Sequence, residues 1–277
     1  ISPLPSPAWS FAAGRVAFNS DRTGVYQIYV YDLASREVVQ LTDGPTRSIE
    51  PSWSPDGQRI AFSMVGPSGN GLELYVMNAD GSNPQPLTAD GAFAVGADWC
   101  PDSERIAFHS NRTGDFEVYV INSDGSGLTN LTNNPAADFM PNWSPDGQSI
   151  VFVSTRAGAF NLFRMNADGT DVRQLTTGLS DNYYPRWSPD GRQILFTRQE
   201  ADDSERIYVM SAEGSELQPL TAFGFNSRGA VWAANGQVIL FASDRTGEWR
   251  LYTMSPDGRD QMVLPPQANG LNPDWTP

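Results

Sequence analysis

Tryptophan recurs along this chain at an almost constant interval. Successive copies are 43 to 46 residues apart, and one further copy, Trp249, falls outside the series. A period of this length marks a supersecondary unit that buries its apolar surface only against its neighbours, so it constrains the fold more than any local signal does. The series consists of Trp9, Trp53, Trp99, Trp143, Trp187, Trp232 and Trp275.

Each interval predicts four short strands. In the second unit, the phrase Pro51-Ser-Trp-Ser-Pro-Asp-Gly57 ends a first strand in a turn, because Pro presets φ, Asp bonds the local backbone and Gly accepts positive φ. The rest of the unit alternates strand-forming runs with turn residues and closes on Leu-Thr, without the 3.6-residue periodicity of an amphipathic helix. The strands expected in this unit are residues 51–54, 59–63, 74–78 and 85–88.

The second and third strands of each unit are nearly continuous apolar runs, such as Arg59-Ile-Ala-Phe-Ser63. Strands of this kind are covered on both faces. A four-stranded sheet that repeats at this period and is covered on both faces predicts a β-propeller, in which blades stack radially around an axis. Six intervals between seven tryptophans therefore predict an all-β, six-bladed propeller of four-stranded antiparallel blades.

The seventh tryptophan segment predicts how the ring closes. Leu271–Trp275 repeats the Pro-x-Trp strand, so we expect it to be the innermost strand of the first blade, paired with residues 16–19. The alternative is that Ala8–Ser10 fills this place. Residues 1–10 are expected to be an extended N-terminal linker or a spare strand, and residues 11–277 a single six-bladed propeller. A spare strand would allow a head-to-tail or strand-swapped assembly, and without it we expect a monomer.

The repeated phrases also carry a family resemblance. Trp-Ser-Pro-Asp-Gly-x-x-Ile-Ala-Phe, followed by Ser-x-Arg-x-Gly and Tyr-Val-Met-Asn-x-Asp-Gly-Ser, resembles the WD40-like (PD40) propeller repeat of the TolB family over essentially the whole chain. The resemblance implies a propeller exported to the bacterial periplasm or cell surface. Because such repeats serve scaffolds, peptide binders and enzyme accessory domains alike, it leaves the function open between these classes.

Composition excludes several other classes. The net charge of −14 leaves no basic face with which to neutralise the phosphates of a nucleic acid. The single cysteine, Cys100, has no intrachain disulfide partner, and with the single histidine, His109, it cannot form a structural zinc site of Cys and His ligands. No apolar run approaches the length needed to span a bilayer.

Functional residues are expected on one of the two faces. The Ser-Pro-Asp-Gly and Asn-x-Asp-Gly-Ser turns share one face, and we expect their aspartates to accept hydrogen bonds within their own turns. The inter-blade connections share the other face, vary between repeats and lead to the channel mouth. Their aromatic, cationic and amide residues predict a recognition surface, with variable solvated loops as the alternative. The candidate binding residues are Arg47, Glu50, Phe93, Asp138, Met140, Asp181, Asn182, Tyr183, Tyr184, Asn226, Arg228 and Asn272.

The sequence fits the known catalytic motifs poorly. It has no Gly-x-Ser-x-Gly elbow, and His109 falls at a variable repeat position where a packing role is expected. We therefore predict a non-enzymatic binding or scaffold propeller without a catalytic residue, metal or cofactor, which holds a protein, peptide or cell-envelope ligand at the channel mouth. Calcium in the channel, held by Glu50, Asp138 and Asp181, is one alternative. The others are an accessory propeller of a larger hydrolase or receptor, and a hydrolase or lyase complete in itself.

Overall fold

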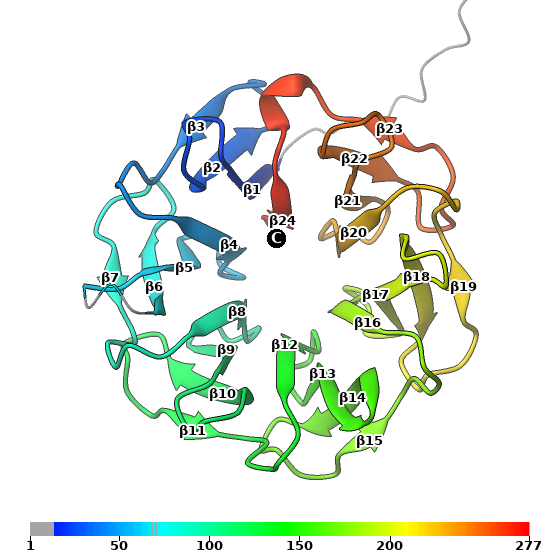
Figure 1. The fold of residues 1–277 in the computed structure, drawn as a ribbon. Coiled ribbons are helices and arrows are strands. Elements are labelled where there is room, and N and C mark those ends of the chain that lie inside the picture. The colour runs from blue at the N-terminus through cyan, green and yellow to red at the C-terminus, as the bar shows by residue number, and fades with distance from the viewer. Residues whose placement is uncertain (1–13, 68, 70, 277) are drawn as a thin grey trace, which may run out of the picture.

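Six four-stranded antiparallel sheets are arranged around a central axis in the computed structural model, which describes residues 14–67, 69 and 71–276 (Figure 1). Each sheet is one blade, with its first strand nearest the axis and its fourth at the outer edge. The predicted six-bladed propeller of four-stranded blades is confirmed.

The first three blades contain the first half of the strands. The innermost strand of blade 1 comes from the C-terminal end of the chain. The strands of blades 1, 2 and 3 are β24 (Leu271–Trp275), β1 (Arg15–Ser20), β2 (Gln27–Asp32) and β3 (Val38–Gln40); β4 (Ser48–Trp53), β5 (Arg59–Val65), β6 (Leu72–Asn78) and β7 (Gln85–Pro86); and β8 (Ala94–Trp99), β9 (Arg105–Ser110), β10 (Glu117–Asn122) and β11 (Thr129–Asn130).

The other three blades follow the same order, and one 3-10 turn, η1 (Pro266–Ala268), precedes β24. Blades 4, 5 and 6 are β12 (Asp138–Trp143), β13 (Ser149–Ala157), β14 (Ala159–Asn166) and β15 (Arg173–Gln174); β16 (Asn182–Trp187), β17 (Gln193–Gln199), β18 (Glu205–Ser211) and β19 (Gln218–Pro219); and β20 (Ser227–Trp232), β21 (Ile239–Ser243), β22 (Arg250–Met254) and β23 (Met262–Val263).

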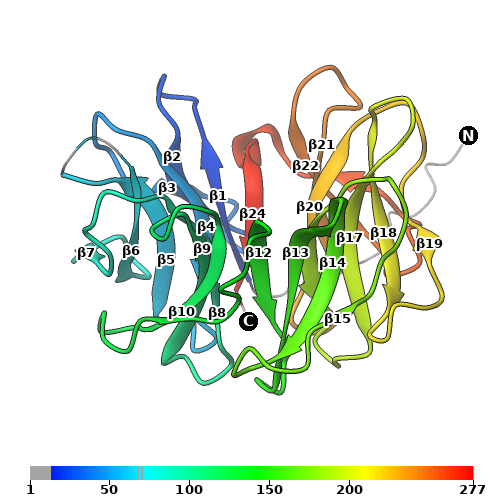
Figure 2. The same ribbon diagram turned by 60° about the horizontal axis from the view of Figure 1, so that its bottom comes forward.

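The C-terminal strand closes the ring as predicted. β24 pairs antiparallel with β1, with Val16 opposite Trp275 and Asn19 opposite Leu271. Figure 1 shows β24 beside β1 near the axis, and Figure 2 shows it running from the upper edge of the propeller to the C-terminus at the lower edge. This pairing joins the two ends of the described chain and gives blade 1 four strands like the others, with a strand partner on each side of β1.

The innermost strands begin earlier than the sequence predicted. The first strand of blade 2 was expected from Pro51 but starts at Ser48, and its fourth strand ends at Pro86 instead of Thr88. The sequence did not predict the early start, because a proline such as Pro51 is commonly the first residue of a strand. The early end has a physical reason: the Thr88 hydroxyl oxygen accepts the Leu74 N–H at 3.0 Å and so takes the place of a strand carbonyl.

The core lies between the blades, not within one sheet. A phenylalanine of each second strand is fully buried and packs on the aromatic ring opposite it in the third strand, with centroids 5.6 to 6.0 Å apart. Each period tryptophan at the end of an innermost strand packs against the preceding blade, as Trp53 does against Ala17 and Ile28 of blade 1. This packing explains why tryptophan marks the period.

The repeated aspartates act in their own turns, as predicted. In the first turn of blade 2, Asp56 Oδ1 accepts hydrogen bonds from the Ser54 hydroxyl at 2.5 Å and the Gln58 N–H at 3.0 Å. These turn bonds hold the pKa of the carboxyl below its ordinary value. The same pair of bonds forms at Asp146, Asp190 and Asp257. In the other turn, Asp80, Asp124 and Asp168 each accept both the hydroxyl and the N–H of the residue two positions later.

Residues 1–10, expected to be a linker or a spare strand, lie outside the described residues, so that expectation and the assembly it would allow stay predictions. Of the residues that the structure describes, none belong to a helix with the length and apolar character to cross a membrane.

Candidate functional site

A ring of six residues with positive φ surrounds the axis, one from each innermost strand. Each lies three residues before the period tryptophan, where two residues of the innermost strand oppose one residue of the second strand in a β-bulge. We call it the bulge ring, and it consists of Glu50 (φ 54°), Gly96 (67°), Met140 (51°), Tyr184 (53°), Gly229 (62°) and Asn272 (49°).

The bulge ring holds side chains in a backbone conformation that favours glycine. Glu50, Met140 and Tyr184 lie in the left-handed region at an expected cost of about 1–2 kcal/mol each. Their N–H groups are satisfied across the blade boundary: Asn19 Oδ1 accepts from Glu50, His109 Nδ1 from Met140, and Met140 Sδ from Tyr184. Glu50 Oε2 in turn accepts the Gly96 N–H at 2.8 Å. The surrounding structure thus fixes these strained positions around the axis.

A second ring lies two residues further along the same strands, and we call it the anchor ring (Ser52, Asp98, Asn142, Arg186, Val231 and Asp274). Three of its polar side chains, those of Asp98, Asn142 and Asp274, accept a backbone N–H of the next blade. Asp274 Oδ2 accepts the Trp53 N–H at 2.6 Å, and Asp98 Oδ2 accepts the Trp143 N–H at 2.7 Å. Asn142 Oδ1 accepts the Trp187 N–H at 2.7 Å, while its Nδ2 donates to Asp98 Oδ1. The anchor ring therefore joins neighbouring blades by direct hydrogen bonds.

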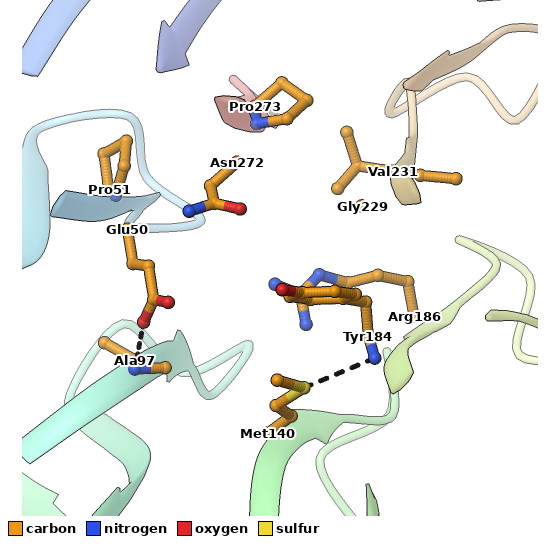
Figure 3. A pocket seen from close by; sticks show the side chains of 12 residues that line it. Glu50, Pro51, Ala97, Met140, Tyr184, Arg186, Gly229, Val231, Asn272 and Pro273 are labelled. Atoms are coloured by element: carbon orange, nitrogen blue, oxygen red, sulfur yellow. Dashed lines mark hydrogen bonds between the residues drawn. The ribbon is translucent and has the colours of Figure 1, made fainter. Parts of the chain in front are cut away.

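The bulge ring, together with Arg186 and Val231 of the anchor ring, lines a cavity on the axis. Figure 3 shows Glu50, Met140 and Asn272 pointing toward the same space as Tyr184 and Arg186, which both come from β16. The cavity has a volume of about 40 Å³, which is room for a few water molecules. A ligand larger than a side-chain tip must therefore bind at the mouth of this cavity instead of inside it.

Arg186 and Glu50 both line the cavity, and the positive charge of Arg186 also acts on two buried carboxyls of the anchor ring, Asp98 and Asp274. Burial raises the pKa of Glu50 and Asp98, and raises that of Asp274 to about 6, while the positive charge of Arg186 opposes the rise in each. Throughout the described ranges no carboxylate oxygen lies within 4.0 Å of the Arg186 guanidinium, which donates to the Pro185 carbonyl at 3.1 Å. Arg186 thus keeps donor capacity that faces the cavity.

An arc of aromatic rings leads away from the cavity on the face of the inter-blade connections. Consecutive centroids are 5.1, 5.8, 5.3 and 6.4 Å apart, and all the rings are half-buried. This aromatic arc crosses blades 3 to 5 and ends at the bulge ring. Its members are Phe116, Phe139, Phe160, Tyr183 and Tyr184.

His109 packs against two rings of this arc. It is 6% exposed, and its ring centroid lies 5.6 Å from those of both Phe116 and Phe139. Burial lowers its pKa to about 3, so the imidazole is neutral at physiological pH and can accept the Met140 N–H through Nδ1. This environment gives His109 a packing role.

The structure separates the predicted site residues into groups. Glu50, Met140, Tyr184 and Asn272 line the cavity, and Tyr183 belongs to the aromatic arc. At the rim, Arg47 is exposed and Phe93 is 37% exposed.

Other predicted residues are engaged within the protein. Asp138 is fully buried and bonds Arg156 at 2.8 Å, and Asn182 is fully buried and donates to the Phe160 and Ser180 carbonyls. Asn226 bonds Asp244 through both its backbone and side-chain nitrogens.

Two further predicted residues take part in contacts at the rim. Asp181 accepts from the Phe160 N–H and the Tyr183 hydroxyl. Arg228 lies 3.5 Å from Glu205 and stacks 4.2 Å from the centre of the Trp249 ring.

Two details of the sequence interpretation need correction. Many of the candidates lie in innermost strands instead of connections, because the bulge turns them toward the axis before the expected strand start. The three carboxylates proposed for calcium are also not gathered: Glu50 lines the cavity, whereas Asp138 pairs with Arg156 and Asp181 with Tyr183. Among residues 14–67, 69 and 71–276, no three His, Cys, Asp or Glu side chains are placed to hold a metal ion together.

The sequence interpretation missed Arg186, Asp98 and Asp274, and most of the aromatic arc. A fixed spacing in the sequence could have identified the ring positions. The bulge ring is always three residues before the period tryptophan, and the anchor ring is always one residue before it. Gly96 and Gly229 at the bulge position could have indicated positive φ. The residue before a proline is instead expected to be extended, which hid the bulge at Glu50, Met140 and Tyr184.

The repeat is that of a known family. The sequence matches the family model described as the TolB beta propeller domain over residues 3–98 and 93–277. The chain belongs to this family. Its resemblance to the TolB repeat is thereby confirmed.

Relatives and solved structures agree with this assignment. The Tol-Pal system protein TolB of Anaeromyxobacter dehalogenans strain 2CP-C is 38% identical over 93 residues, which are 33% of this chain and 20% of that protein. The chain thus matches only about a fifth of the length of such relatives. The crystal structure of TolB from Acinetobacter baumannii has a TM-score of 0.81 at 21% identity and covers 95% of this chain and 67% of its own. An oligogalacturonate lyase in complex with manganese has a TM-score of 0.64 at 15% identity, with 90% of this chain and 73% of its own covered, which is a likeness of fold alone.

Proposed function

We propose that this propeller is a non-enzymatic binding module that holds a protein partner of the bacterial cell envelope at its channel mouth. The observation that carries the proposal is the aromatic arc, which ends at a cavity containing Arg186. Half-buried aromatic rings beside one cation with spare donors are the composition of an interaction hot spot. The relatives named Tol-Pal system protein TolB support an envelope protein as the partner and a place in the periplasm.

The cavity volume defines how such a partner would bind. About 40 Å³ admits only the tip of one side chain, so the partner would lie over the arc and direct one acceptor group toward Arg186. The arc would supply the apolar contact area, and the guanidinium would fix the orientation. Neither contact requires a metal or a cofactor.

The absence of enzymatic activity stays a prediction. His109, the only histidine of the chain, is neutral, buried and bonded to the Met140 N–H, so it is poorly placed for proton transfer to a ligand in the cavity. Release of unsaturated uronates from pectin fragments would contradict the prediction and favour a lyase.

Calorimetric titration with the Pal protein encoded in the same genome tests the proposal. We expect Tyr183→Ala together with Tyr184→Ala to weaken binding at least a hundredfold, because both rings lie in the arc beside the cavity. Leu128→Ala is the matched control: this side chain is 44% exposed in a turn on the opposite face, and its removal should leave the affinity unchanged. Equal affinity of the wild-type chain and the double variant would refute the site.

A further inference from the structure

Several grooves between neighbouring blades are covered by an arginine on the face of the Ser-Pro-Asp-Gly turns, which is the lower edge in Figure 2. In four grooves the guanidinium carbon of the preceding blade lies over the period tryptophan of the next blade. The pairs are Arg15 on Trp53 at 4.5 Å, Arg59 on Trp99 at 4.6 Å, Arg105 on Trp143 at 5.0 Å and Arg164 on Trp187 at 5.5 Å.

The covering arginine comes from one of two places. In blades 1 to 3 it is the first residue of the second strand. In blade 4 that position is Ser149, and Arg164 of the third strand covers the ring instead while donating to the Ser149 hydroxyl at 3.3 Å. Two different strands thus supply the same contact, which indicates that the indole face favours a guanidinium.

The groove between blades 5 and 6 lacks this cover. Gln193 occupies the first position of β17, and Val209 occupies the place that Arg164 has in blade 4. Within the described part of the chain, no guanidinium lies over the Trp232 ring. Trp232 is accordingly half-buried, whereas the four covered tryptophans are only 3 to 8% exposed.

An open groove of about 520 Å³ lies at this place. Its walls include Trp232 with Pro189 and Pro256, and its rim carries Asp190, Gln193 and Gln237. Asp190 Oδ1 is engaged by the Ser188 hydroxyl and the Arg192 N–H, while the nearest cation to Oδ2, Arg192, lies 3.9 Å away with its side chain 85% exposed. The groove therefore offers an aromatic face beside a carboxylate that has no close ion pair.

We propose that this groove binds an arginine side chain of a partner protein, with the guanidinium stacked on Trp232 and paired with Asp190. The chain's own arginines show the geometry at four equivalent places, 4.5 to 5.5 Å above the ring. The net charge of −14 and the carboxylate at the rim complement a cationic group. This site lies on the face opposite the channel mouth, so it is independent of the proposed function and would allow one propeller to contact two partners.

Titration of the ¹⁵N-labelled protein with three capped tripeptides, Gly-Arg-Gly, Gly-Lys-Gly and Gly-citrulline-Gly, tests the proposal. The indole N–H signal of Trp232, identified from a Trp232→Phe variant, is the readout. Only the arginine peptide should shift it saturably, in the millimolar range, because lysine cannot stack a planar cation and citrulline is neutral. The covered Trp53, Trp99, Trp143 and Trp187 are internal controls and should not shift. Equal responses to arginine and citrulline, or equal shifts at the covered tryptophans, would overturn the proposal.

Variants at the groove make the test specific. Gln193→Arg restores the covering arginine of blades 1 to 3, so it should abolish the response and raise the melting temperature. Gln193→Ala is the matched control and should keep the response. Asp190→Asn retains an oxygen for the turn bonds and should weaken arginine binding at least threefold. A full response in both Gln193→Arg and Asp190→Asn would place the peptide elsewhere and refute the site.

Discussion

The bulge ring and the anchor ring lie two residues apart on the same strands, yet they use their side chains in different ways. The bulge ring varies in chemistry from glycine to tyrosine, and its common property is a positive φ. The anchor ring bonds the backbone of the next blade at Trp53, Trp143 and Trp187. A propeller can therefore vary the residues that face a ligand, because the residues two places away hold the blades together.

Removing a central anchor should have the largest effect. Asp98→Ala leaves the Trp143 N–H and the Asn142 amide without their acceptor, and we expect a loss of about 3 kcal/mol in the free energy of unfolding. Urea denaturation measures it. Ser52→Ala is the control in the same ring and should change stability by less than about 0.5 kcal/mol. Equal effects of the two substitutions would remove the distinction between anchors and other members of the ring.

The sequence predicted the architecture far better than the site. The tryptophan period gave the blade number, the closure by Leu271–Trp275 and the role of the turn aspartates, because all three follow from repeated local chemistry. The site depends on side chains that meet only after the ring has closed. Arg186, for example, acts on carboxyls of blades 1, 2 and 3. The spacing places Arg186, Asp98 and Asp274 at equivalent positions of their repeats, but it does not say which of these side chains interact across the axis.

Two glycines of the bulge ring separate backbone strain from steric conflict. A Cβ at Gly96 would lie 2.7 Å from the His109 ring, whereas at Gly229 the nearest atom would be Pro273 Cδ at 4.0 Å. Since both have positive φ, Gly229→Ala should cost about 1 kcal/mol and Gly96→Ala about 2 kcal/mol in thermal unfolding. Combining Gly96→Ala with His109→Ala should cost less than the sum of the two single variants. Equal losses of stability at the two glycines would show that the His109 side chain moves aside at no cost.

The anchor at the ring closure should respond to pH. The folded state raises the pKa of Asp274 to about 6, above an ordinary value of 3.8, so its ionisation opposes folding. The stability it contributes is complete below about pH 4 and is lost as the pH rises through 6. Asp274→Asn keeps an acceptor for the Trp53 N–H, as Asn142 does for Trp187, and cannot ionise. We expect this variant to be about 1 kcal/mol more stable than wild type at pH 7.5 and equal to it at pH 4 in urea titrations; a constant difference across this range would contradict the assignment.

The smallest effect should come from the bulge residue of the same closing strand. Asn272→Gly relieves a left-handed conformation that asparagine already tolerates, and it removes one 3.2 Å hydrogen bond to Asn19 Oδ1. These changes oppose each other, so we expect the free energy of unfolding to stay within about 0.5 kcal/mol of wild type. A loss as large as that of Asp98→Ala would mean that the bulge ring also holds the blades together, and its variety would then need another explanation. A small effect would leave these positions open to change for ligand binding without loss of the fold.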